Sequence, residues 1–137
     1  MLDRLDVNLI CGFIGALLGA CFGEINGLFV ALIIFMIMDY VSGIMCAIYN
    51  KRLSSNIGFK GLIKKAAILV VVIIGNTVDV FILQNNGNVC RNMVVMFYLS
   101  NEGISILENY NKMNLPFPAK LRKILLQLTQ PSDDDKI

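Results

Sequence analysis

Residues 28–49 read LFVALIIFMIMDYVSGIMCAIY and contain a single charged side chain, that of Asp39. A helix of this length is ~33 Å long, which is enough to cross a bilayer hydrocarbon core of ~30 Å. The basic pair Lys51 and Arg52 follows directly, as is typical of the cytoplasmic end of a span. The stretch therefore predicts a membrane-spanning helix with one carboxyl group near its middle.

The composition of the whole chain supports a membrane protein. Hydrophobic residues make up 56% of the 137 residues, charged residues make up 16%, and the mean hydropathy is +0.68. A soluble domain of this size carries about 25% charged residues. The chain has no histidine, and its four cysteines form no Cys-x-x-Cys motif. We expect one membrane domain covering residues 1–137, with no enzymatic activity, no catalytic residues, no metal and no cofactor.

Three further segments extend the prediction to an all-α integral membrane protein. Segments 7–23 and 66–83 are apolar and would be ~25 Å and ~27 Å long as helices. Asp79, toward the far end of the third span, is expected to be hydrated at interface depth. Segment 92–110 is ambiguous, because polar residues recur along one side at helical spacing. It fits either a fourth span whose polar side faces a channel or a helix lying on the membrane surface.

Two blocks of basic residues indicate the topology. One lies within residues 50–65 and the other within 111–130, and neither block contains an acidic residue. Blocks next to apolar spans mark the cytoplasmic side and argue against nucleic-acid binding. If both are cytoplasmic, the chain crosses twice between them, so we favour four spans over three, with both termini cytoplasmic. The basic residues assigned to the membrane surface are Lys51, Arg52, Lys60, Lys64, Lys65, Lys120, Arg122 and Lys123.

The C-terminal segment, 111–137, is predicted to be cytoplasmic. Pro116 and Pro118 end the preceding helix. Residues 119–130 then predict a short basic amphipathic helix, which suits the anionic inner leaflet. The final residues, 131–137, carry three consecutive aspartates and predict disorder.

Glycines recur every four residues through the first span and its exit. Such a row of small side chains lets two helix backbones approach closely. The pattern fits oligomerisation and fits packing within one monomer equally well. The candidate helix-packing glycines are Gly15, Gly19, Gly23, Gly27 and Gly43.

Asp39 and the polar side of segment 92–110 supply the candidate functional residues. An ionised carboxylate in mid-span costs at least ~2.5 kcal/mol on insertion scales, so it should be protonated, paired or facing water. Two interpretations of Asp39 stay open, a pore-lining or gating contact and a buried hydrogen bond to another helix. The pore-lining or gating candidates are Asp39, Glu102, Ser105 and Glu108.

Many of the residues named above, with others near them, match the sequence pattern of one known protein family. The matching positions are Asp39, Gly43, Ala47, 53–55, Gly58, Gly61, 64–65, Asp79, 101–102, 105–109, Pro116, Pro118 and Leu121. In this order, over roughly residues 28–125, the chain resembles the toxin secretion/phage lysis holin family of Gram-positive bacteria and their phages. The resemblance implies a homo-oligomer that opens holes in the bacterial cytoplasmic membrane. An endolysin, or a toxin, passes through such a hole, and with an endolysin the host cell lyses.

Two other functions stay open on the sequence. A small multi-span ion channel or proton-coupled transporter subunit also has short spans and an intramembrane carboxylate. It would release little protein and would show saturable flux. An accessory or anchor subunit would use its basic C-terminal helix to dock a soluble partner, and removal of residues 112–137 would abolish its activity.

Overall fold

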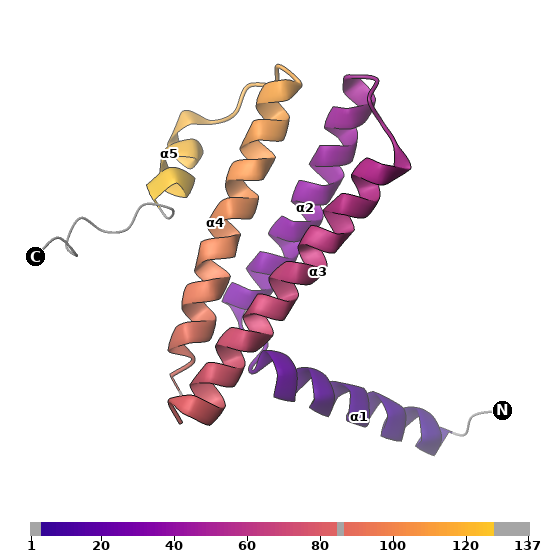
Figure 1. Cartoon of the computed structure of the whole chain (residues 1–137), viewed down its shortest axis with the longest axis vertical. Helices are drawn as coiled ribbons and strands as arrows, with labels where there is room; N and C mark the ends of the chain where they lie inside the picture. Colours follow the sequence, from indigo (N-terminus) through magenta and orange to yellow (C-terminus); the bar gives the residue numbers. More distant parts are fainter. Residues whose placement is uncertain (1–3, 85–86, 128–137) are drawn as a thin grey trace, which may run out of the picture.

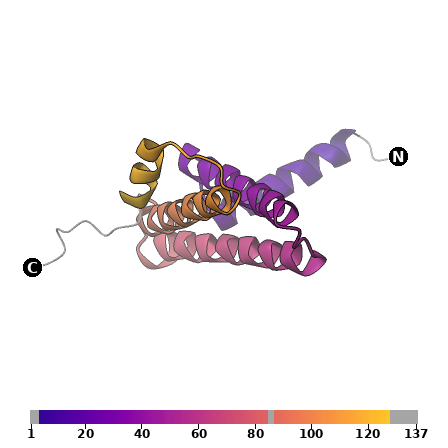
Figure 2. The same ribbon diagram turned by 90° about the horizontal axis from the view of Figure 1, so that it is seen from above.

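The computed structural model describes residues 4–84 and 87–127, and all regular structure within those ranges is helical. The elements are α1 (Arg4–Phe22), α2 (Gly27–Tyr49), α3 (Ser55–Thr77), η1 (Val78–Ile82), α4 (Val89–Lys112) and α5 (Ala119–Gln127). Helices α2, α3 and α4 lie side by side as a three-helix bundle (Figure 1, Figure 2). Helix α1 runs away from one end of the bundle, and α5 lies beside α4 (Figure 1). The all-helical prediction is confirmed.

Within residues 4–84 and 87–127, three helices are long and apolar enough to cross a membrane. They cover Arg4–Phe22, Gly27–Tyr49 and Ser55–Ile82. This agrees with the first three predicted spans. Helix α4 does not belong to this set, because its polar residues lower its hydropathy.

The boundary between the second and third spans differs from the prediction. Helix α3 begins at Ser55, eleven residues before the expected start of the span, so the connection is only residues 50–54. The physical reason is the N-cap at Ser54, whose hydroxyl oxygen accepts a hydrogen bond from the Ile57 amide at 3.4 Å. Lys60, Lys64 and Lys65 lie on this helix.

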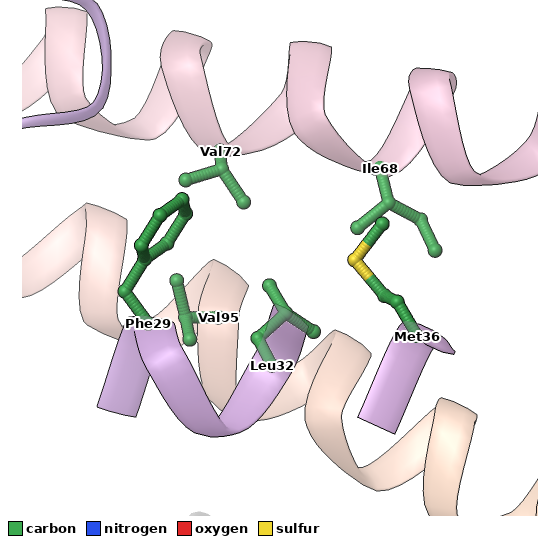
Figure 3. Close-up of a cluster of buried hydrophobic side chains, with 6 residues drawn as sticks. All are labelled: Phe29, Leu32, Met36, Ile68, Val72 and Val95. Carbon is green, nitrogen blue, oxygen red and sulfur yellow. The ribbon is translucent and has the colours of Figure 1, made fainter. Parts of the chain in front are cut away.

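The apolar core joins the three bundle helices. Its side chains come from one face of α2 (Phe29, Leu32 and Met36), one face of α3 (Ile68 and Val72) and Val95 of α4 (Figure 3). Spacings of three and four residues place each set on a single helix face. Three of these six side chains are completely buried. This core fixes the rotation of each helix, and hence which polar residues point inward.

Helix α1 contains no buried residue and contacts α3 among the described elements. No side chain lies within 4 Å of a Cβ placed on Gly15, Gly19 or Gly27, so no described helix of this chain packs against these positions. Gly23 differs, because it ends α1 with φ +73°. A Cβ placed on Gly43 would lie 3.7 Å from the side-chain amide nitrogen of Asn109. The helix-packing role of these glycines stays a prediction.

The C-terminal end of α1 is fixed to the bundle by two side chains. Asn76 of α3 donates its amide hydrogens to two α1 carbonyl oxygens, at 3.2 and 3.0 Å. Arg91 of α4 donates to two more carbonyl oxygens, at 2.5 and 2.6 Å. The four acceptors belong to Ala20, Cys21, Phe22 and Glu24. The bonds to Ala20, Cys21 and Phe22 satisfy carbonyls that the end of α1 leaves without partners.

Helix α5 packs against the middle of α4. A Cβ on Gly103 would lie 2.9 Å from Leu125 Cδ2, so the leucine occupies the space that this glycine leaves. Leu125 is buried, whereas Leu121 and Ile124 of the predicted apolar face are exposed. The helix ends at Gln127, and residues 128–137, including the predicted disordered tail, lie outside the described residues.

Candidate functional site

The candidate site is a cluster of three charged side chains at the centre of the bundle. Lys65 of α3 donates hydrogen bonds from its ammonium group to Asp39 Oδ2 of α2 and to Glu102 Oε2 of α4. The three residues are 8%, 9% and 0% exposed, respectively. One cation thus joins two carboxylates from the two other bundle helices. We call these three residues the ion cluster.

Two polar side chains surround Asp39. The Ser42 hydroxyl donates to the Asp39 carbonyl oxygen at 3.0 Å. The side-chain amide of Asn109 on α4 donates to Ser42 Oγ at 2.9 Å and lies 3.4 Å from Asp39 Oδ1. These contacts connect α2 to α4 directly. Together with the ion cluster, Ser42 and Asn109 form a row of polar side chains between the helices, which we call the polar seam.

The ion cluster carries one more negative than positive formal charge. Glu102 Oε1 is buried and accepts no hydrogen bond from any described residue. Lys64 Nζ lies 4.0 Å from that oxygen, and the Lys64 side chain is 60% exposed. Lys64, which lies at the surface of the bundle, therefore offsets the excess negative charge of the ion cluster. Unpaired buried charge is costly in a membrane, so this arrangement favours the closed packing of the three helices.

The four pore-lining or gating candidates do not lie together. Asp39 and Glu102 meet at Lys65, and Ser105 lies beside them, partly buried. Glu108 is exposed and lies outside the ion cluster. A pore-lining role for these residues stays a prediction.

Lys65 is the exception among the basic residues assigned to the membrane surface. The other seven are exposed, whereas Lys65 is buried inside the bundle. The early start of α3 explains the difference, because it places Lys65 three turns inside a helix that packs on α2 and α4. The basic block predicted a surface position for Lys65, so the sequence left Asp39 without a partner.

The expectation that Asp79 is hydrated is also corrected. Asp79 is completely buried, and its carboxylate accepts hydrogen bonds from the backbone amides of Cys90 at 3.0 Å and Arg91 at 2.8 Å. It therefore satisfies free amides in the first turn of α4. Arg91 is equally buried, and its guanidinium carbon lies 5.4 Å from the centre of the Phe29 ring.

A cavity of about 610 Å³ adjoins the ion cluster. Asp39 and Lys65 contribute to its lining, together with the second half of α2, the α2–α3 connection, the start of α3 and the end of α4. In the part of the chain that the structure describes, no group of His, Cys, Asp and Glu residues could hold a metal ion.

The sequence of the chain matches the profile of the bacteriophage holin family over residues 16–130. An uncharacterized protein of Listeria monocytogenes is 41% identical, with 93% of this chain and 89% of that protein aligned. An uncharacterized 14.9 kDa protein of Clostridium perfringens is 38% identical over 84% of this chain and 86% of its own length. A probable holin of Bacillus phage phi105 is 33% identical over 82% and 81%. No solved structure matches the chain significantly.

Proposed function

The chain belongs to the bacteriophage holin family, and from this premise we propose that it forms holes in the bacterial cytoplasmic membrane. An endolysin, or a toxin, leaves the cytoplasm through such a hole. The observation that carries the proposal is the family match over residues 16–130, which includes the whole three-helix bundle. The proposed activity needs no catalytic residue and no cofactor. Its partners are the lipid bilayer, further copies of the chain, and the enzyme or toxin that passes.

The polar seam of the bundle provides a physical route to a hole. In the closed monomer, Asp39, Lys65 and Glu102 satisfy one another, so the outer surface of the bundle stays largely apolar. If α2 and α4 separate in an oligomer, the same side chains become available to water. Charged residues inside membranes face either a bundle interior or a water-filled path. The ion cluster therefore suits both the closed bundle, where its charges pair, and an open hole, where they face water.

We also propose that α4 is the fourth span. It runs alongside α2 and α3 (Figure 1), so a bilayer crossed by those two helices would surround α4 as well. The α2–α3 connection and the end of α4 lie at the same end of the bundle (Figure 1). Both basic blocks begin there, which supports a cytoplasmic location for that end. With α1 as the first span, both termini are then cytoplasmic.

Timed expression in bacteria tests the proposed function. The chain is expressed with and without a cytoplasmic endolysin, while culture density and the release of a large cytoplasmic enzyme are followed. We expect abrupt lysis only when endolysin is present, with escape of the large enzyme. Continued growth with an intact membrane potential would overturn the proposal.

The ion cluster also favours a second candidate, a small ion channel or proton-coupled transporter subunit. Intramembrane carboxylates mark proton relays in pumps and transporters. Such a protein would dissipate an ion gradient without releasing the large enzyme. The same expression experiment therefore separates the two candidates.

A further inference from the structure

We infer that the cavity beside the ion cluster binds the phosphate group of an anionic phospholipid. The cavity lies between the second half of α2, the beginning of α3 and the end of α4. Its volume of about 610 Å³ is within the range of small-molecule sites in proteins. Binding of a lipid headgroup is a property separate from hole formation.

The charge of the cavity lining selects for an anion. Four cations line it, Arg52, Lys64, Lys65 and Lys112, against one carboxylate, that of Asp39. Lys65 already pairs with that carboxylate. Among the described residues, Arg52 and Lys112 form no ion pair, and both are exposed. They come from the α2–α3 connection and from the last turn of α4, so the fold brings together two cations that are far apart in sequence.

The walls of the cavity favour a lipid over a free phosphate ion. Ile44, Ala47 and Ile57 line it together with the cations, so an apolar surface lies next to the positive charge. Inorganic phosphate would use only the cations, whereas a phospholipid would also place its glycerol and upper acyl chain against the apolar wall. Basic pockets between membrane helices at the cytoplasmic side are sites for anionic headgroups. Both basic blocks begin at this end of the bundle (Figure 1).

Glycines keep the cavity open on the α3 side. Gly58 and Gly61 line it, and Cβ atoms added there would lie 3.4 and 3.3 Å from the Tyr40 side chain. Tyr40 can therefore rest against the backbone of α3 without closing the space. Larger side chains at these two positions would push the ring toward the cavity.

Titration of the purified full-length protein with short-chain lipids tests the inference. Protein in a neutral detergent is titrated with dihexanoyl phosphatidylglycerol, dihexanoyl phosphatidylcholine or inorganic phosphate, and bound ligand is counted by native mass spectrometry. The cavity variant is Arg52→Gln with Lys112→Gln. The control is Lys51→Gln with Lys60→Gln, which removes the same charge from exposed residues at the same end but outside the cavity.

We expect the wild-type protein to bind phosphatidylglycerol in preference to phosphatidylcholine. The cavity variant should bind it about 25-fold more weakly, because each Lys or Arg near an anionic headgroup contributes a factor of about five. The control variant should stay within about twofold of the wild type. Equal weakening of the two variants would overturn the inference in favour of general surface charge. Binding of inorganic phosphate as tight as that of the lipid would overturn the assignment to a lipid.

A second pair of variants tests the site without removing a cation. Ile57→Glu places a carboxylate in the cavity lining, whereas Leu53→Glu places one on the adjacent connection outside it. Both positions are exposed, so both variants should keep the wild-type helical content in circular dichroism. Only Ile57→Glu should weaken phosphatidylglycerol binding, and equal binding by the two variants would contradict the site. Neither titration depends on lysis, so its failure would leave the proposed hole-forming function untouched.

Discussion

The ammonium group of Lys65 lies between two carboxylates that belong to different helices. Within the described residues, it is the group that contacts both Asp39 and Glu102. Removing one partner from a buried ion cluster leaves charges without compensation, which costs more than the cluster contributes when intact. The stability of the bundle should therefore depend on this one side chain more than on any exposed lysine.

The first prediction concerns Lys65→Met. The variant should lose about 3–5 kcal/mol of unfolding free energy, because two carboxylates then face each other without a cation. Unfolding of the purified protein in micelles, followed by circular dichroism, measures the change. Lys60→Met, exposed on the same helix, is the control and should unfold like the wild type. Identical behaviour of the two variants would show that the ion cluster does not hold the helices together.

Among single residues, the sequence identified the two carboxylates of the ion cluster as candidates but not its cation. Asp39 stands out because a carboxyl group is costly in an apolar run. Lys65 did not, because it belongs to a basic block that predicts a position at the membrane surface. Glu102 and Glu108 share the predicted polar stripe, yet they are about 120° apart around a helix, so only one can face the bundle interior. The packing of α4 against the neighbouring helices determines which glutamate faces the interior, and the local sequence pattern of α4 does not contain that information.

Helix α1 differs from the bundle helices because it is fixed only at its C-terminal end. Its apolar surface is exposed over residues 4–20, and Gly15 and Gly19 contact no other described helix of the chain. In a membrane, such a surface meets either lipid or another copy of the protein. Close packing through small residues favours the second possibility.

The second prediction follows from this open glycine row. Gly19→Leu should weaken self-association, since the added side chain holds two helix backbones apart. The fold of the monomer should be unaffected, because no side chain lies within 4 Å of that Cβ position. Chemical cross-linking in membranes, resolved by electrophoresis, measures the effect. Leu17→Phe adds bulk to the opposite, exposed side of α1 and should leave the cross-linking ladder unchanged. A full ladder with Gly19→Leu would exclude the glycine row from the interface.

At the element scale, the helices were predictable, but their ends and partners were less so. Long apolar runs predict spans because only a helix satisfies its own backbone within lipid. Helix α3 begins eleven residues before the predicted span, since its first three turns carry polar and glycine residues that also occur in loops. The docking of α5 depends on Leu125 meeting Gly103, a contact between residues that no local pattern connects.

At the scale of the whole molecule, the bundle places its polar residues inside and its apolar residues outside. Asp39, Lys65, Glu102 and Asn109 line the contact between the helices, while large apolar side chains cover the exterior. Opening such a bundle exchanges internal ion pairs for water. Under the proposed function, the energetic balance of that exchange sets how readily the closed form gives way to a hole.

The third prediction tests that balance. Asp39→Asn removes the excess negative charge of the ion cluster and leaves Lys65 paired with Glu102, so it favours the closed packing, and lysis in the presence of endolysin should begin later than with the wild type. The time of the abrupt fall in culture density is the measurement. Glu108→Gln, which changes an exposed carboxylate outside the cluster, should keep the wild-type time. Unchanged timing with Asp39→Asn would argue against a gating role for this residue.

The hydrogen bonds at the end of α1 also set an order for biosynthesis. Arg91 follows its acceptor Phe22 by 69 residues, so α1 leaves the ribosome well before the side chain that fixes it. At a synthesis rate of ~5–20 residues per second, this delay is roughly 3–14 s. During that interval α1 lacks the two bonds from Arg91, although Asn76 of α3 is made earlier. The attachment of the first helix is thus complete only when the last helix of the bundle has been made.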